Sequence, residues 1–318
     1  MKIPVLIVGY ARPKGVLRIL EALKHYEANI YVYIDGQKSL NKNSKQIEFE
    51  DVVKNYVREN PNKTIEYCHL SQNVGAAVNV ITSIDACFET EQELIILEDD
   101  LIISTDFLRF VEIAMPIMKD NLKVKMITGT NPFYEKTTKN VIHWTTYPLV
   151  WGWATSKSNW IEMRQAIFNP KINRTNFRDR RTLNFFRAGK NQSLKGFVDA
   201  WDLPLAGSFH AQDWKTLVPP VNLISNVGFD DGATHTRENI WPLGLEINNL
   251  IWNEIEISDL TYDNSLCLDL EMEDKVYKIK KYHIFSHIKS QIIEKVSKSK
   301  INSLQSRINF ISNTKRSS

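Results

Sequence analysis

The first hundred residues alternate between short apolar runs and segments in which apolar residues recur at helical spacing. A continuous apolar run of this kind is typical of a strand buried on both faces, whereas the i, i+3, i+4 spacing predicts an amphipathic helix. An order of strand, helix, strand predicts an α/β fold, with a mainly parallel sheet and helices on both of its faces. Strands are expected at 4–9, 30–34, 64–70 and 93–97, and helices after Pro13, over about 48–59 and over 75–88.

Polar residues follow each of the four predicted strands. In open parallel sheets, ligands bind outside the carboxyl ends of the strands, so these residues are the first candidates for a site. An arginine, an aspartate and a group of carboxylates at one edge suit a nucleotide diphosphate bound together with a divalent metal. The four segments are Tyr10-Ala11-Arg12, Asp35-Gly36, Ser71-Gln72-Asn73 and Glu98-Asp99-Asp100.

The acidic triplet Glu98-Asp99-Asp100 directly follows the apolar run ELIIL. Adjacent carboxylates at the end of a buried strand repel one another, and a bound cation relieves that repulsion. Mg²⁺ and Mn²⁺ prefer oxygen ligands and often bridge a few carboxylates to substrate phosphates. A metal site is therefore one interpretation of the triplet, and a solvated acidic turn is the other.

The second half of the chain has a different character. Residues 131–165 are rich in aromatic side chains, whereas 169–195 are polar and basic and are expected to form a loop or insertion. A strand is expected at 221–224, followed by a segment rich in Gly, Asp and Thr. We expect three parts, at 1–130 and 131–245, followed by a basic, largely helical extension at 246–318.

Two further segments carry candidate chemistry. In Trp201-Asp202, the indole could desolvate the carboxylate and raise its pKa, as suits a general base, although a surface or capping aspartate is an equal alternative. In 228–236 (GFDDGATHT), the glycines would permit a loop that opens and closes. A second metal site at Asp230-Asp231 is less expected than a plain turn.

Several of these segments together resemble glycosyltransferases with the GT-A fold, especially the N-acetylglucosaminyltransferase I type and its bacterial relatives. LEDDLIISTDFLRF resembles their EDD version of the DXD motif, and PLVWGWATSKSNW resembles their aromatic Gly-Trp segment. VPPVNLISNVGFDDGATHT is similar to their donor-closing loop. The resemblance covers roughly residues 3–240 and implies a Rossmann-like GT-A domain with a C-terminal helical extension. In that domain, 1–130 would be the nucleotide-sugar-binding half and 131–245 the acceptor-binding and catalytic half.

The resemblance implies a role for each matching residue on the donor side. Asp100 would bind Mn²⁺ or Mg²⁺ at the donor diphosphate, while Asp99 and Glu98 would contact the ribose and the donor sugar. The residues expected around the nucleotide and its phosphates are Arg12, Asp35 at the base edge, Asn73, and Thr234 and His235 in the closing loop.

On the acceptor side, the resemblance implies that Asp202 takes the proton of the attacking hydroxyl and that the reaction inverts the anomeric configuration. Leu203-Pro204-Leu205 departs from the family, which often has an aromatic residue there, so Asp199 is an alternative base. Trp151 and Trp153 would stack on sugar faces, or would be core aromatics beside a glycine.

Charge is divided unevenly along the 318 residues. The net charge of +3 hides a tail at 275–318 with eleven Lys or Arg and one acid, a net charge of +10, which leaves −7 for residues 1–274. Apolar residues recur at helical spacing in this tail, so it either binds an anionic membrane surface or packs on the body with a solvated lysine face. An acidic body does not predict nucleic-acid binding.

Composition places the chain among globular proteins, with 43% hydrophobic and 24% charged residues. The stretch 3–11 is expected to be a buried strand and not a secretory signal, and no run approaches the length of a membrane-spanning helix. Three widely spaced cysteines argue against a disulfide framework and for a reducing compartment. We expect a cytoplasmic protein that could bind peripherally to the inner face of the membrane.

These observations predict a metal-dependent, inverting glycosyltransferase. It would move a sugar, most simply from a UDP-sugar, to a saccharide or a lipid-linked saccharide in cell-surface polysaccharide or lipopolysaccharide synthesis. One alternative is a nucleotidyltransferase acting on sugar phosphates, which can use a similar sheet and metal carboxylates. The other is a non-catalytic saccharide-binding relative of the transferases.

Overall fold

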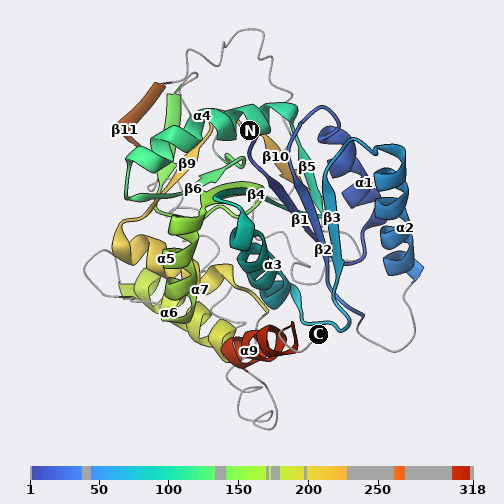
Figure 1. The fold of residues 1–318 in the computed structure, drawn as a ribbon. Helices are drawn as coiled ribbons and strands as arrows, with labels where there is room; N and C mark the ends of the chain where they lie inside the picture. The colour runs from blue at the N-terminus through green and yellow to red at the C-terminus, as the bar shows by residue number, and fades with distance from the viewer. Residues whose placement is uncertain are drawn as a thin grey trace.

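A central nine-stranded sheet organises the computed structural model of this chain (Figure 1). Its strand order is β11-β7-β9-β6-β8-β4-β1-β2-β3, and a separate two-stranded sheet pairs β10 with β5. The structure describes residues 2–37, 44–132, 141–169, 172, 180–196, 199–227, 261–268 and 303–315.

The first half of the chain forms the parallel part of the sheet, as the sequence predicts. Strands β4, β1, β2 and β3 lie side by side, and all three neighbouring pairs are parallel. The elements are β1 (Val5–Gly9), α1 (Pro13–Ala22), β2 (Ile30–Ile34), α2 (Ser44–Glu59), β3 (Ile65–His69), α3 (Ala76–Thr90) and β4 (Glu93–Glu98). Every residue of β1 and β2 is buried, which explains their uninterrupted apolar sequences.

The second half adds strands of both directions to the same sheet. Strand β8 lies antiparallel between β4 and β6, β6 pairs with β9 in parallel, and β9 pairs with β7 antiparallel. The elements are β5 (Leu101–Ile103), α4 (Thr105–Asp120), β6 (Val124–Thr128), β7 (Val141–Thr145), β8 (Trp153–Ser156), α5 (Lys157–Phe168), α6 (Arg180–Leu194), α7 (Asp202–Gln212), β9 (Lys215–Val218), β10 (Ile224–Asn226), β11 (Thr261–Cys267) and α9 (Leu304–Lys315).

Two local expectations differ from the structure. The loop predicted for the basic stretch at 169–195 is wrong for residues 180–194, because they form helix α6. Leu183 and Phe186, three residues apart on this helix, are buried against Tyr147. The strand expected at 221–224 lies slightly later, at Ile224–Asn226.

The core has two layers because successive side chains of a strand point to opposite faces of the sheet. Val5 and Ile7 pack with residues of α1, α2 and α4, whereas Leu6 and Val8 pack with residues of α3, α5, α7 and α9. Figure 1 shows α1 and α2 gathered on the right and α5, α6 and α7 on the lower left. The predicted α/β class, with a mainly parallel sheet covered by helices on both faces, is confirmed.

The tail helix α9 packs on the body. Leu304 and Ile308, one turn apart, are each 1% exposed and join the core layer that includes α3. Helix α9 lies against α3 and α6 (Figure 1). For residues 304–315 the structure therefore favours the packed alternative, while 269–302 lie outside the described residues. Among the helices that the structure describes, none combines the length and apolarity needed to span a membrane.

Candidate active site

The candidate site lies at the carboxyl edge of the parallel strands. Because β4, β1, β2 and β3 run in the same direction, the segments that follow them emerge at one edge. The amide of Asp35, just after β2, donates to the carbonyl of Gly9 at the end of β1 (3.0 Å). Antiparallel β8 pairs Trp153 with Ile96 of β4, so the residues before Trp153 lie at this edge too.

Arg12 joins two members of the acidic triplet. Its Nη1 lies 3.1 Å from Oδ1 of Asp99 and 3.2 Å from Oδ2 of Asp100. The other oxygen of Asp99 accepts from the amide of Tyr10 (2.8 Å). The Asp99 side chain is 5% exposed and that of Asp100 is 14% exposed. Asp99 therefore holds Arg12 from within the protein, whereas Asp100 is the more open of the two carboxylates.

Burial and mutual repulsion make this cluster costly to ionise. Burial raises the pKa of Glu98 and that of Asp100, and the neighbouring carboxylates of the triplet raise both further, while Arg12 acts in the opposite direction. Asp202 also raises the pKa of Glu98. Asp202, more than a hundred residues later in the chain, is therefore electrostatically part of the same cluster.

Helix α1 approaches the cluster closely because Gly15 has no side chain. A Cβ at this position would overlap the main-chain oxygen of Asp99. At Gly9, a Cβ would lie 2.5 Å from the ring of Phe49 and 3.1 Å from Oδ2 of Asp99. Gly15 thus lets α1 pack directly against the end of β4, and Gly9 leaves room beside β1 for the ring of Phe49 on α2.

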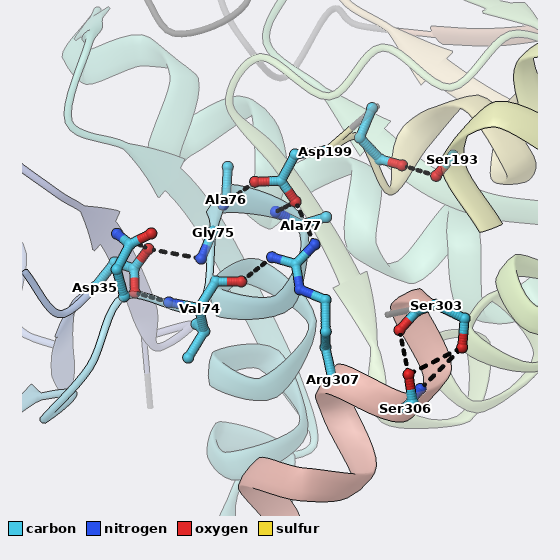
Figure 2. Close-up of polar contacts among 12 residues, drawn as sticks. Asp35, Val74, Gly75, Ala76, Ala77, Ser193, Asp199, Ser303, Ser306 and Arg307 are labelled. Carbon is cyan, nitrogen blue, oxygen red and sulfur yellow. Dashed lines mark hydrogen bonds and ion pairs between the residues drawn. The ribbon is translucent and has the colours of Figure 1, made fainter. Parts of the chain in front are cut away.

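Asp35 organises the loop between β3 and α3. One of its oxygens accepts from the amides of Gly36 (2.8 Å) and Val74 (2.8 Å), and the other from Nδ2 of Asn73 (2.8 Å) and the amide of Gly75 (2.9 Å). Figure 2 shows the bonds from Val74 and Gly75. Burial raises the pKa of Asp35, and three backbone N–H groups lower it. Asp35 and Asn73, both assigned to the nucleotide from the sequence, are brought together, and the contact with a base stays a prediction.

Asp199 caps helix α3 from a distant part of the chain. Its Oδ2 accepts from the amide of Ala76 (2.8 Å), and Oδ1 lies 3.4 Å from the amide of Ala77 (Figure 2). Arg307 of α9 completes the set with Nη1 at 3.4 Å from Oδ1 of Asp199. A side-chain acceptor at a helix N-terminus satisfies amides that have no partner within the helix. Asp199 therefore has a structural role at the N-terminus of α3.

Asp202 begins helix α7 directly after a buried aromatic residue. Trp201 is 5% exposed and stacks on Trp153, with ring centroids 5.5 Å apart. Asp202 itself is half-buried. Of the two candidate bases that the sequence left open, Asp202 interacts with the acidic cluster and Asp199 caps α3.

The two tryptophans assigned to sugar stacking have different surroundings. Trp153 is 1% exposed and packs between Trp160 and Trp201. A ring enclosed in this way cannot stack on a sugar, so the sugar-stacking assignment of Trp153 is wrong in this structure and the core alternative holds. Trp151 is half-buried at the carboxyl edge, and its carbonyl accepts from Oγ1 of Thr130 (2.7 Å). Its contact with an acceptor stays a prediction.

The residues just before the predicted closing loop contact the acidic cluster. The amide of Val227 donates to the carbonyl of Asp100 (2.9 Å), and Nδ2 of Asn226 lies 3.5 Å from Oδ1 of Asp100. Thr234 and His235, together with the Asp230-Asp231 pair, lie outside the described residues.

Two residues in this arrangement were not expected from the sequence. Asn226 stands two residues before the glycine-rich segment, and that position is the only signal that could have indicated it. Arg307 counts in the sequence only as one positive charge of a basic tail. Its pairing with Asp199 depends on where α9 packs, which local sequence does not determine.

Comparison with known proteins gives fold-level likenesses only. No protein-family model and no curated protein sequence matches the chain. Among solved structures, S. aureus TarS 1–349 shares 12% identity with a TM-score of 0.39, over 69% of this chain and 58% of that chain.

Two further solved structures overlap with the chain to a similar degree. Mannose-1-phosphate geranyltransferase from Thermus thermophilus shares 12% identity with a TM-score of 0.34, over 69% of this chain and 74% of that chain. The 4-diphosphocytidyl-2C-methyl-D-erythritol synthase from Anaerococcus prevotii shares 14% identity with a TM-score of 0.34, over 59% of this chain and 84% of that chain. At TM-scores this low, such likenesses decide neither the fold family nor the reaction.

Proposed function

We propose that this chain is a metal-dependent glycosyltransferase of the GT-A type that moves a sugar from a nucleotide-sugar donor to a hydroxyl with inversion. The observation that carries the proposal is the carboxylate cluster at the carboxyl edge of the sheet, with Arg12 on one side and Asp202 within electrostatic reach of Glu98. A cation and several carboxylates at this edge suit a donor that brings phosphates and a metal together.

The metal of this proposal would be Mn²⁺ or Mg²⁺, which prefer oxygen ligands such as the carboxylates of the triplet. Within the described residues, no group of three or more His, Cys, Asp or Glu side chains could enclose a metal by itself. Asp100, the more open carboxylate, would therefore be the main protein ligand, and substrate phosphates would supply others, as is common for Mg²⁺. The repulsion that raises the pKa of Glu98 and Asp100 would be relieved by such an ion. The bound ion would neutralise the leaving diphosphate.

The residues around the metal ligand would bind and orient the donor. Arg12 would contact the diphosphate from the start of α1, and Asp99 would hold Arg12 in place, since both of its oxygens already have partners. Glu98 would face the donor sugar. The loop ordered by Asp35 and Asn73 would border the nucleotide base, and Thr234 and His235 would close over the phosphates.

Asp202 would act as the general base. Its carboxylate would accept the proton of the acceptor hydroxyl while the hydroxyl oxygen forms a bond to the anomeric carbon. The bond from that carbon to the diphosphate oxygen breaks at the same time, and the diphosphate leaves with the electron pair. One in-line displacement inverts the configuration. Trp151, at the same edge, would contact the acceptor sugar.

The donor would be a UDP-sugar, and the acceptor a saccharide or a lipid-linked saccharide of a cell-surface polysaccharide. A lipid-linked acceptor would place the enzyme in the cytoplasm at an anionic membrane surface. Of the basic tail beyond residue 275, the structure describes 303–315, and α9 within it packs on the body, so the membrane contact would fall to other residues of the tail. Sedimentation with and without anionic vesicles tests this part.

The function is tested by incubating the protein with Mn²⁺ and UDP-, GDP- and dTDP-sugars and measuring the release of nucleoside diphosphate. Asp202→Asn should reduce turnover by about 100-fold or more while donor binding persists. Asp120→Asn, an exposed position at the end of α4, is the matched control and should retain activity.

Other outcomes of this assay separate the competing functions. Release of pyrophosphate from a nucleoside triphosphate would identify a nucleotidyltransferase. Saccharide binding without turnover would favour the non-catalytic relative, and no binding or turnover with any of these donors would contradict the proposal.

A further inference from the structure

Arg307 joins helix α9 to two distant segments of the candidate site. Its Nη1 lies 3.4 Å from Oδ1 of Asp199, 108 residues earlier, and its Nη2 donates to the carbonyl of Val74, 233 residues earlier (Figure 2). The side chains of Arg307 and Asp199 are each 27% exposed. One side chain therefore bridges the loop before α3 and the segment that leads into α7.

The backbone amides of residues 74–76, next to Arg307, donate hydrogen bonds to two different carboxylates. Asp35 accepts from the amides of Val74 and Gly75, and Asp199 accepts from the amide of Ala76. The two carboxylates repel each other, since Asp199 raises the pKa of Asp35. A guanidinium against Asp199 offsets this repulsion and lets both carboxylates hold the same short stretch of backbone.

The segment 199–202 leads directly from this bridge to the proposed base. Asp199 is held by Arg307, the carbonyl of Ala200 accepts from Oγ of Ser193, and Trp201 stacks on Trp153. Asp202 is the next residue and the first of α7. The hydrogen bonds of Asp199 to Ala76 and Ala77 fix this segment to the N-terminus of α3.

We infer that Arg307 is a positioning residue for the transfer reaction. By holding Asp199 against the N-terminus of α3, Arg307 fixes the start of α7 and so places Asp202 relative to the carboxylate cluster. Arg307 acts through Asp199 and takes no part in bond making. The inference rests on the proposed function, because it concerns how a residue of the tail helix α9 positions the proposed base, Asp202, relative to the donor.

An ion pair between α5 and α3, with similar exposure, provides the control. Nε of Arg164, on α5, lies 2.8 Å from both carboxylate oxygens of Asp85, and these side chains are 34% and 30% exposed. Arg164 links α5 to α3, and Arg307 links α9 to the segment before α3 and to Asp199. Arg164 pairs with Asp85 in the middle of α3 and does not contact the segment before the helix. Arg164→Ala therefore measures the effect of losing an ion pair away from the candidate site.

The test compares the full-length Arg307→Ala, Arg307→Lys and Arg164→Ala proteins. If Arg307 positions Asp202, then Arg307→Ala lowers kcat by about 10- to 100-fold with little change in the donor KM, since small misplacements of reacting groups have effects of this size. Arg307→Lys restores part of the rate, because a cation still faces Asp199. Arg164→Ala leaves kcat near that of the wild type.

A second measurement does not depend on turnover. Amide hydrogen exchange in the peptides that contain Ala76, Ala77 and residues 199–202 should be faster in Arg307→Ala than in the wild type and in Arg164→Ala. Equal exchange in the three proteins would overturn the inference, whatever the activity.

The kinetic outcomes separate this inference from the proposed function. Normal turnover by the wild type together with equal kcat values for Arg307→Ala and Arg164→Ala would overturn the positioning role alone. Absence of turnover by the wild type with every donor would overturn the proposed function and, with it, the role of Arg307 in the reaction.

Discussion

A guanidinium nitrogen of Arg12 lies 3.2 Å from Oδ2 of Asp100, although α1 and β5 are far apart in the sequence. The parallel pairing of β1 with β4 produces this contact, because it places the ends of both strands at one edge. Asp100 thus has a guanidinium against Oδ2 and the side-chain amide of Asn226 near Oδ1, and its side chain is 14% exposed. The proposed metal would have to bind in these surroundings.

Replacing Asp100 should remove the metal dependence of nucleotide binding. Asp100→Asn keeps the shape of the side chain but removes the anionic ligand, so the metal-dependent affinity for a nucleoside diphosphate should fall by about tenfold or more, about 1.4 kcal/mol. The shift in melting temperature caused by the nucleotide, with and without Mn²⁺, measures this effect. Asp120→Asn is the control, and an unchanged Mn²⁺-dependent shift in Asp100→Asn would remove Asp100 from the metal site.

Gly75 should be sensitive to any side chain. Its φ of +84° is unfavourable for other residues, and an added Cβ would overlap Oδ2 of Asp199 and the guanidinium of Arg307. Gly75→Ala should lower the free energy of unfolding by about 1–3 kcal/mol. Urea denaturation measures this change.

Gly189, inside helix α6, is the matched control for Gly75. There the nearest atoms that a Cβ would meet belong to Leu203, at 3.6 Å or more, so Gly189→Ala should leave stability unchanged or raise it by up to about 1 kcal/mol. Equal effects of the two substitutions would contradict the account of the Gly75 turn.

His143 should make stability depend on pH below neutrality. It lies on β7 and is 4% exposed, and burial lowers its pKa from 6.5. The unfolded chain therefore binds a proton at a higher pH than the folded chain. Stability from this residue is complete above pH 6.5 and is lost as the pH falls below 6.5 toward the lowered pKa.

Urea denaturation of the wild type and of His143→Gln at about pH 7.5 and 5.5 tests this dependence. The wild type should lose more stability on acidification than His143→Gln does. His25→Gln, at an exposed position, is the control and should behave as the wild type. An identical loss in all three proteins would show that other groups cause the acid sensitivity.

Helix α9 should contribute measurably to the stability of the body. Leu304 is 1% exposed in the core layer shared with α3, so Leu304→Ala should lower the free energy of unfolding by about 2–5 kcal/mol. Leu122→Ala, at a position 85% exposed, should change it by no more than about 0.5 kcal/mol. Similar small effects of both would indicate that α9 is not packed on the body in solution.

The centre of the parallel part of the sheet could be predicted because β1 and β2 are buried on both faces. Such strands, like Val5–Gly9 and Ile30–Ile34, consist of apolar residues without interruption, and the polar residues that follow them mark the edge of the sheet. The acidic triplet and Arg12 could be predicted to lie near each other from this order alone. The structure confirms their contact.

Other features depend on packing between distant segments and left little trace in the local sequence. Helix α6 could not be recognised among its basic residues, since the apolar anchors Leu183 and Phe186 are too few to give a clear periodicity. From the sequence alone, Trp153 could be a ligand-binding tryptophan or a core tryptophan. Its position between Trp160 and Trp201 shows that it belongs to the core. The pairing of Arg307 with Asp199 requires the placement of α9, which no periodicity encodes.

The close approach of Gly15 to the main chain of Asp99 ties two stretches of sequence to each other. Any side chain at position 15 would push α1 away from the end of β4 and would carry Arg12 away from the carboxylates. Homologues that keep the acidic triplet in this arrangement should therefore keep glycine three residues after the arginine. This pairing of an R-P-x-G motif with a later E-D-D motif offers a pattern by which distant relatives of the chain could be recognised where overall sequence identity is too low.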